Sequence, residues 1–204
     1  NTKEPTLEPR KASQRRETAE TQVTVEVNID GQGLSTIDTG NGMLDHLLAQ
    51  LSRHGLFDME IAAQGAVQVG WHHVTEDVAI TLGRALREAV GDGRGITRMA
   101  SAHVPLDEAL ARVVVDFSGR GYAAVDLGIG DADMGGLSGD LVSHFLETLA
   151  REGGFNVHAH LLSGTNNHHK AEAVFKALAR ALRAALAVDP RREDQVPSTK
   201  GTLR

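Results

Sequence analysis

Cysteine is absent from this chain of 204 residues, and aromatic side chains are few, with five Phe, one Tyr and one Trp. Without thiols the chain cannot form disulfides, iron–sulfur clusters or thiolate metal sites, and it offers no cysteine nucleophile. Any bound metal must therefore be held by nitrogen and oxygen atoms. The scarcity of aromatic rings also leaves little surface for stacking on nucleic acid bases.

Positive charge is in deficit, since 21 Lys and Arg face 27 Asp and Glu and the formal net charge is −6. This balance does not favour nucleic acid as a partner. No apolar run approaches the length of a membrane span, and residues 1–20 lack the apolar core of a signal peptide. We therefore expect a cytoplasmic globular protein that binds neither nucleic acid nor membrane.

The local pattern predicts a strand, a second strand, a helix, a strand and a helix. Residues 1–20 are charged and contain two prolines, so we expect at least the first dozen to be a mobile tail, with the fold starting after them. Alternation predicts a strand at 24–30, and Gly31 with Gly33 predicts a hairpin turn after it. Apolar spacing predicts helices near 43–55 and 71–90, and a strand lies between them.

The second half of the chain repeats this order, and individual residues match as well. Residues 25–33 align with 113–121, residues 43–58 with 141–156, and residues 72–90 with 168–186. We place the half-repeats at 1–95 and 96–204. Each half would cover one face of a small sheet with two helices, so we predict one compact α+β unit with an internal pseudo-twofold axis.

Histidine is abundant, with ten residues, and the repeat places two His-His pairs at equivalent positions. His72 and Glu76 are four residues apart, as are His168 and Glu172. Residues four apart lie one above the other on a helix, so each pair presents an imidazole and a carboxylate to one point. A single His-His pair is more often solvated or packed than ligating, but this duplicated arrangement favours metal binding.

Further imidazoles come from the second histidine of each pair, which lies about 100° further round its helix, and from one histidine on the other helix of each half. The first predicted site consists of His72, Glu76, His144 and His169, and the second of His168, Glu172, His46 and His73. Which half or subunit supplies each ligand is left open. Three imidazoles and one carboxylate suit Mn²⁺, Fe²⁺, Co²⁺ or Zn²⁺ better than Ca²⁺ or Mg²⁺.

At these residues the chain resembles the imidazoleglycerol-phosphate dehydratase family of histidine biosynthesis. The resemblance covers about residues 14–202 and depends on the order of nine motifs. These are RETAET (16–21), DTGNGMLDHLL (38–48), HHVTEDVAITLG (72–83), GRGITRM (93–99), PLDEAL (105–110), DFSGRGY (116–122), HFLETLA (144–150), GTNNHHKAEAVFKALARAL (164–182) and VPSTKG (196–201). Leu106 replaces the family's usual Met, and Gly70-Trp71 stands where polar residues often occur; neither change touches a proposed ligand.

The resemblance implies a ribosomal protein S5 domain 2-like fold with two βββαα-type halves. It also implies two manganese ions per active site and a homo-oligomeric shell of 24 subunits with active sites between subunits. The implied reaction removes water from D-erythro-imidazoleglycerol phosphate to give imidazoleacetol phosphate. Two metals flanking the substrate ring would favour a metal-bound imidazolate, whose electrons can expel the C3 hydroxyl before a base takes the C2 proton.

Several residues are assigned roles by this resemblance. The candidate proton carriers are Glu20, which also belongs to the substrate site, and the ligand carboxylates Glu76 and Glu172. Asp107 and Glu108 are either turn residues or carboxylates that orient ligand histidines. The substrate-phosphate set is Gln50, Arg98, Arg120, Ser198 and Lys200. The C-terminal segment that carries the last two is expected to fold back over the site.

Three alternatives stay open at this point. A metal-binding shell without catalysis explains the histidines but gives no reason for the phosphate set. A metallohydrolase would use a metal-bound water, although two nearly equivalent sites fit capture of an imidazole better. A structural role for the histidines would predict a fold indifferent to chelators. We expect His103, His158 and His160 to be structural and leave His54 unassigned.

Overall fold

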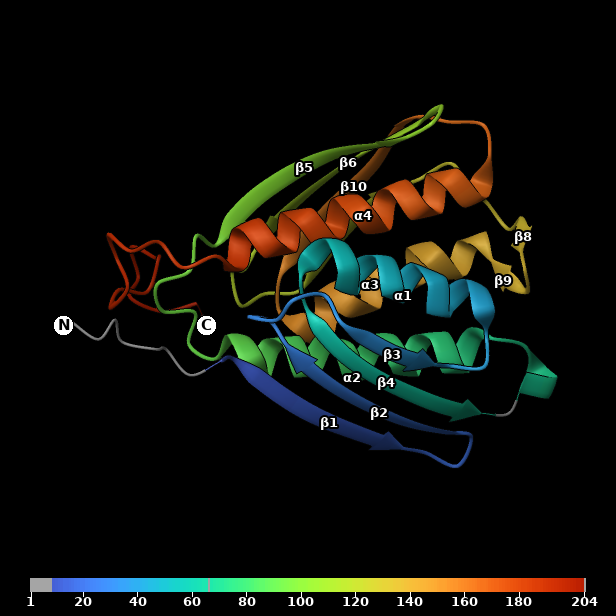
Figure 1. Cartoon of the computed structure of the whole chain (residues 1–204), viewed down its shortest axis with the longest axis horizontal. Helices are drawn as coiled ribbons and strands as arrows, with labels where there is room; N and C mark the ends of the chain where they lie inside the picture. Colours follow the sequence, from blue (N-terminus) through green and yellow to red (C-terminus); the bar gives the residue numbers. More distant parts are fainter. Residues whose placement is uncertain (1–8, 66, 204) are drawn as a thin grey trace.

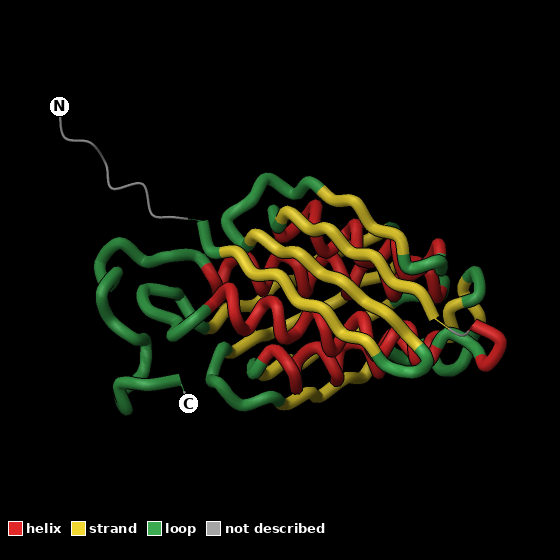
Figure 2. Tube along the Cα trace, turned by 90° about the horizontal axis from the view of Figure 1, so that it is seen from below, coloured by secondary structure: helices red, strands yellow, loops and turns green. Residues whose placement is uncertain are grey.

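Two four-stranded sheets enclose four helices in the computed structural model, which describes residues 9–65 and 67–203 (Figure 1). Seen from below, the strands of the first sheet lie in front of the helices (Figure 2). The first sheet contains β1 (Lys11–Glu17), β2 (Thr21–Asn28), β3 (Ser35–Asp38) and β4 (Asp58–Gly65). The second contains β5 (Met99–Leu106), β6 (Ala109–Asp116), β7 (Tyr122–Asp126) and β10 (Asn156–Ser163).

The two sheets have the same topology. Their strand orders are β1-β2-β4-β3 and β5-β6-β10-β7. In each, the first three strands are antiparallel, and the last strand pairs in parallel with its neighbour. A short hairpin of β8 (Asp133–Met134) and β9 (Leu137–Ser138) is inserted in the second half. The duplicated α+β architecture predicted from the sequence is confirmed.

Each half packs helices on its own sheet, whereas the main helix–helix contacts cross between the halves. The helices are α1 (Gly42–Gly55), α2 (His72–Val90), α3 (Gly139–Gly153) and α4 (Asn167–Leu186), with a 3₁₀ turn, η1 (Val67–Val69), before α2. Helix α2 lies on β1 and β2, and α4 lies on β5 and β6. In the middle layer α1 packs on α4, and α3 packs on α2. One apolar core therefore runs through both halves, with Phe57, Phe145, Phe155 and Phe175 fully buried.

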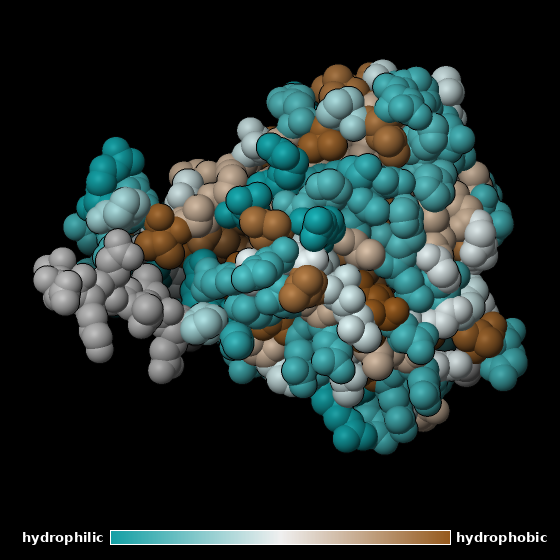
Figure 3. Space-filling view, in the orientation of Figure 1, coloured by the Kyte–Doolittle hydropathy of each residue, from teal (hydrophilic) through white to brown (hydrophobic). Residues whose placement is uncertain are grey.

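All four helices begin at the same end of the molecule, beside the β8–β9 hairpin (Figure 1). The eight predicted metal ligands lie in the first two turns of these helices. The face shown in Figure 3 is largely hydrophilic, with only separate small hydrophobic patches. Within residues 9–65 and 67–203, no helix combines the length and the apolar character needed to cross a membrane.

Two local predictions are wrong. The expected tail covers residues 11 and 12, but β1 already begins at Lys11, because its alternate residues face α2 and its full length pairs with β2. The remainder of the expected tail includes residues 1–8, which lie outside the described residues. The hairpin expected at Gly31 and Gly33 does not form, since β2 pairs with β1 and β4 and not with β3. Instead the Asp58 carboxylate accepts the backbone N–H groups of Gln32 and Leu34 and ties this loop to β4.

The half-repeat boundary expected at residues 95 and 96 falls in the connection between α2 and β5. An isolated bridge joins Ile96 to Val188, just after α4. The connection between the halves is therefore fastened to the C-terminal end of the second half.

Candidate functional site

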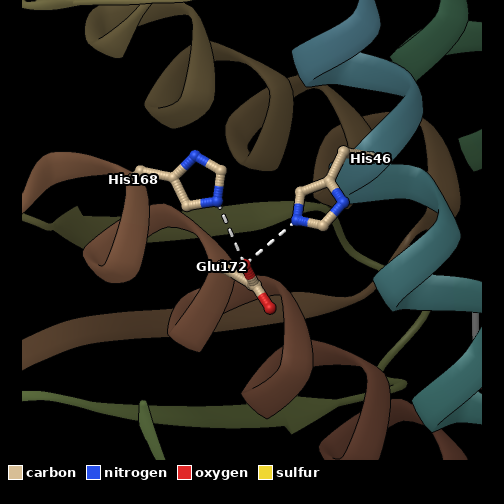
Figure 4. Close-up of side chains that lie close together, drawn as sticks. All are labelled: His46, His168 and Glu172. Atoms are coloured by element: carbon tan, nitrogen blue, oxygen red, sulfur yellow. Dashed lines mark hydrogen bonds and ion pairs between the residues drawn. The ribbon is translucent and has the colours of Figure 1, made fainter. Parts of the chain in front are cut away.

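The first cluster joins α1 to α4 and consists of His46, His168 and Glu172 (Figure 4). One carboxylate oxygen of Glu172 lies 3.0 Å from His46 Nε2 and 3.2 Å from His168 Nε2. The start of α4 is fixed locally, because the Asn166 side chain accepts the backbone N–H groups of His168 and His169. Both imidazoles therefore converge on a carboxylate whose side chain is only 13 % exposed.

The second cluster joins α2 to α3 and consists of His72, Glu76 and His144. The His72 and His144 rings are stacked with centroids 4.7 Å apart, and His144 Nε2 lies 3.4 Å from Glu76 Oε1. In each cluster the three candidate ligand atoms lie within 4.8 Å of one another. Each cluster takes residues from both halves of the chain, so the cross-half packing of the helices is what assembles it.

The donor chemistry of both clusters fits a divalent transition metal. Each offers two imidazole nitrogens and one carboxylate, a set that suits Mn²⁺, Fe²⁺, Co²⁺ or Zn²⁺ and leaves coordination positions open. His144 Nε2 is buried and has no hydrogen-bond partner within residues 9–65 and 67–203. Its 3.4 Å contact with Glu76 Oε1 is not a hydrogen bond. A buried polar nitrogen without a hydrogen bond is costly, and a bound cation beside Glu76 would satisfy it.

His73 and His169 do not join the clusters of their own chain. The sequence left open which half or subunit supplies each of the four ligands, so the four-ligand sets stay a prediction. His73 Nδ1 lies 2.9 Å from Glu20 Oε2, and His169 Nδ1 lies 2.8 Å from Glu108 Oε2. A helix turns by about 100° per residue, so the second histidine of each pair faces the adjacent strand turn rather than the cluster. Glu20 and Glu108 occupy equivalent turns, between β1 and β2 and between β5 and β6.

These two contacts leave the Nε2 atoms of His73 and His169 for another partner. Glu108 accepts a hydrogen bond from His169 Nδ1, and such a bond fixes the ring orientation and makes the other nitrogen a better metal ligand. The contact of His73 with Glu20 is an ion-pair distance without a hydrogen bond. Glu108 contacts His169, and its role as an orienting partner of a ligand histidine stays a prediction; Asp107 is a turn residue with φ 48°. His103, His158 and His160 lie on β5 and β10, outside both clusters.

Lys176 is a residue that the sequence analysis missed. Its Nζ lies 2.6 Å from Glu172 Oε1, one helical turn further along α4. Burial raises the pKa of Glu172, but hydrogen bonds from Lys176 and His46 outweigh it and lower the pKa to about 2. The carboxylate is therefore ionised at neutral pH, as a metal ligand must be. The signal was present in the four-residue spacing of Glu172 and Lys176.

Glu108 is held more tightly than Glu20. Its carboxylate accepts from His169 Nδ1 and from the backbone N–H groups of Thr165 and Asn166, at 3.1 and 2.8 Å. These bonds hold the pKa of Glu108 well below its ordinary value. The hydrogen bond that His169 donates to Glu108 in turn raises the pKa of His169.

Replacing Glu108 by Gln is expected to lower the pKa of His169 toward that of an ordinary histidine, because a neutral amide no longer stabilises the imidazolium. The His169 ring would then lose its proton at a lower pH than in the unmodified protein. Titration of the ring signals by NMR in chelator-treated protein measures this shift, with His169→Gln identifying the signal. An unchanged His169 titration would show that Glu108 does not control this imidazole.

The predicted phosphate-binding residues lie away from the clusters. The Arg98 backbone N–H donates to the Ala185 carbonyl at the C-terminal end of α4, and the Arg98 guanidinium donates to the Pro197 carbonyl at 2.8 Å. It also pairs with Asp116 at 2.7 Å. Arg120 is in the loop after β6, and Ser198 and Lys200 are in the C-terminal segment. This segment lies at the end of the molecule opposite the N-termini of the helices (Figure 1).

The structure therefore does not bring the predicted phosphate-binding residues of one chain to the candidate metal clusters of that chain. The first cluster lies at the N-terminal end of α4 and the Arg98 backbone at its C-terminal end. The helix between His168 and Ala185 is roughly 25 Å long at 1.5 Å per residue. Gln50 is the exception, because it lies on α1 one turn after His46, with its Oε1 3.1 Å from His54 Nε2. The expectation that the C-terminal segment folds back over a site does not hold within one chain, since this segment packs at the opposite end.

Comparison with known proteins matches the chain to one family over nearly its whole length. The family model described as imidazoleglycerol-phosphate dehydratase matches residues 39–182. The imidazoleglycerol-phosphate dehydratase of Dehalococcoides mccartyi (strain CBDB1) is 54 % identical over 194 residues, covering 95 % of this chain and 97 % of that protein. The one from Methanothermobacter thermautotrophicus is 50 % identical over 194 residues, covering 95 % and 98 %.

Solved structures of the same family also match the fold of this chain. The crystal structure of imidazoleglycerol-phosphate dehydratase from Staphylococcus aureus superposes with a TM-score of 0.79 at 35 % identity, covering 88 % of this chain and 99 % of that one. A crystal structure of the Pyrococcus furiosus enzyme gives a TM-score of 0.79 at 40 % identity, covering 92 % and 99 %. The motif order, the duplicated fold and these matches coincide, and the chain therefore belongs to the imidazoleglycerol-phosphate dehydratase family of hydro-lyases.

Proposed function

We propose that this hydro-lyase converts D-erythro-imidazoleglycerol phosphate to imidazoleacetol phosphate and water in the cytoplasm, as a step of histidine biosynthesis, with two Mn²⁺ per active site. The observation that carries the proposal is the pair of equivalent clusters of two histidines and one glutamate. An imidazole substrate has two ring nitrogens, one for each metal. Bound divalent ions would withdraw electron density from the ring and so ease departure of the C3 hydroxyl.

Glu20 is the carboxylate best placed to move the substrate proton. Its side chain is 57 % exposed and lines an open pocket of about 440 Å³ together with Arg16, His73 and Glu76. Glu76 and Glu172, the other predicted proton carriers, each face two imidazoles and act as metal ligands in this proposal. A ligand carboxylate has its lone pairs committed, whereas Glu20 keeps an oxygen available for general base catalysis.

The active site is shared between copies of the chain. The three-carbon chain that joins the imidazole and the phosphate of the substrate spans roughly 5 Å, far less than the length of α4. The phosphate set of Arg98, Arg120, Ser198 and Lys200 must then serve the clusters of a neighbouring copy. His73 and His169, which face away from their own clusters, are proposed as the fourth ligands of the metals of neighbouring copies. A closed homo-oligomer satisfies both requirements, and we propose the 24-subunit shell of the family.

Turnover by chelator-stripped protein, with and without added Mn²⁺, tests the function. We expect imidazoleacetol phosphate, followed by the absorbance of its enolised form, to appear only with metal. If metal binds but no product forms, a storage role or a metallohydrolase replaces the dehydratase. Inorganic phosphate should compete with the substrate in a dehydratase, whereas a storage protein has no use for a phosphate site.

Lys200→Ala is expected to raise KM by about 10- to 100-fold, because a charge-assisted hydrogen bond to phosphate contributes about 1.5–3 kcal/mol. Metal content should stay unchanged, since Lys200 is not one of the residues of the two candidate metal clusters. Lys11→Ala, which alters an exposed lysine on β1, is the matched control and should leave KM unchanged. Steady-state kinetics with metal analysis measures both, and an unaltered KM in Lys200→Ala would remove this residue from the substrate site.

A further inference from the structure

The RETAET motif contains three residues, Arg16, Thr18 and Thr21, for which the proposed function gives no role. They flank Glu20 at the turn between β1 and β2, and two of them reach across to Asp77 on α2. Asp77 directly follows the ligand Glu76 and is only 6 % exposed. We therefore expect groups that pair with this carboxylate, because burial of an unpaired ionisable group is costly.

A continuous chain of hydrogen bonds runs from Asp77 to the backbone at Glu20. Arg16 Nε donates to Asp77 Oδ1 at 2.6 Å, and the Thr21 hydroxyl donates to Asp77 Oδ2. The Thr18 and Thr21 hydroxyl oxygens are 3.0 Å apart. Because the Thr21 hydroxyl donates its proton to Asp77, Thr18 is the donor of this pair, and the Thr18 hydroxyl also lies 3.5 Å from the Thr21 backbone carbonyl. Thr18 Oγ1 in turn accepts the backbone N–H groups of Glu20 and Thr21, at 3.1 and 3.0 Å.

The equivalent turn of the second half lacks this series of hydrogen bonds. The repeat offsets place Val104, Ala109 and Ala173 at the positions of Arg16, Thr21 and Asp77. That turn is held instead through the carboxylate of Glu108 itself, which accepts from three N–H groups. For Glu20, the described residues give the carboxylate one contact, to His73. The two turns are therefore fixed in opposite ways, one through the backbone and the other through the side chain.

We propose that Asp77, acting through Thr21 and Thr18, is the positioning residue for Glu20 in the dehydration; this inference rests on the proposed function. Proton transfer needs a carboxylate that is held in place and yet keeps a free lone pair. Hydrogen bonds to the Glu20 carboxylate, like those on Glu108, would occupy its oxygens. Hydrogen bonds to the turn backbone locate the carboxylate and leave it free. Arg16 compensates the buried charge of Asp77.

Thr21→Val tests this directly, because it removes the connecting hydroxyl and keeps the side-chain shape. We expect kcat to fall by roughly 10- to 100-fold, the usual effect of a misplaced catalytic group, with KM, bound metal and assembly unchanged. Thr21→Ser keeps the hydroxyl and should retain nearly full kcat. Thr81→Val is the matched control: Thr81 is a buried threonine on α2 that donates to the Asp77 backbone carbonyl, and its loss should leave kcat unaltered.

Hydrogen–deuterium exchange of the metal-free protein supplies a readout that does not depend on turnover. The backbone N–H groups of Glu20 and Thr21 should exchange faster in Thr21→Val than in the unmodified chain and in Thr21→Ser. Thr18→Val, which interrupts the same series of hydrogen bonds at an exposed residue, should reproduce both the faster exchange and the lower kcat. This second variant keeps the test valid if Thr21→Val does not fold.

Each outcome separates the positioning role from the proposed function. An unmodified enzyme without dehydratase activity would overturn the proposed function and with it the positioning role, even if the exchange data showed the turn to be held. An active enzyme whose Thr21→Val and Thr18→Val variants keep full kcat would overturn the positioning role alone. Loss of metal or of thermal stability in proportion to the loss of kcat in both variants would also overturn it, because the bonds would then be merely structural.

Discussion

Glu172→Gln is expected to remove one of two bound metal ions per chain and to lower kcat/KM by about 10³-fold, since a catalytic metal contributes several kcal/mol to the transition state. The Glu172 carboxylate lies between His46 and His168 and is ionised at neutral pH. Gln is neutral and can offer only a weak carbonyl ligand. The substitution also leaves the Lys176 ammonium without its partner at 2.6 Å, so that positive charge would face the metal position.

The equivalent change in the other cluster, Glu76→Gln, should also remove one ion but with a smaller loss of affinity. The residue one turn after Glu76 is Ile80, so no ammonium is left behind. Glu147→Gln, at an exposed position on α3, is the control and should keep both ions. Elemental analysis and steady-state kinetics measure the effects. Two ions retained in Glu172→Gln would show that this carboxylate is not a ligand.

Glu20→Gln is expected to lower kcat by about 10²- to 10⁴-fold, the range for loss of a general base, while both metal ions stay bound. Glu20 is exposed in the pocket beside His73 and Glu76, and the amide cannot accept the substrate proton. Because Glu20 takes up the proton only in the transition state, its loss should change KM little. Kinetics and elemental analysis on the same preparation give the comparison.

Glu108→Gln provides the matched comparison for Glu20→Gln, because the two glutamates occupy equivalent turns. We expect kcat to depend far less on Glu108, whose carboxylate is occupied by four donors. If Glu20→Gln instead lost metal with little further effect on kcat, Glu20 would be an orienting partner of His73 and the proton carrier would have to be sought elsewhere.

The clusters show what helical periodicity and an internal repeat can predict. The spacing of His72 and Glu76, and of His168 and Glu172, placed each pair on one helix face, and the structure brings these pairs to His144 and His46. Periodicity could not predict the partners of His73 and His169. Those partners lie on strand turns far away in the sequence, and their contacts depend on how each sheet packs against its helix.

Other features could not be predicted from the sequence, and each has a physical reason. Strand β1 escaped prediction because its inward side chains include Gln14 and Arg16, which pair with Glu88 and Asp77 instead of forming an apolar stripe. The opposite placement of the phosphate set and the clusters depends on all four helices starting at one end, a property of the topology rather than of any local segment. The repeat itself predicted the duplicated fold, because matching residues in the two halves implied the same order of elements in each half.

Anomalous scattering from Mn²⁺-loaded crystals is the measurement that tests the two-metal arrangement most directly. We predict two equivalent peaks per chain, one bound by His72, Glu76 and His144 and the other by His46, His168 and Glu172. Each should also be bound by a second-position histidine, His73 or His169, of a neighbouring copy. A single peak, or peaks away from both clusters, would contradict the account.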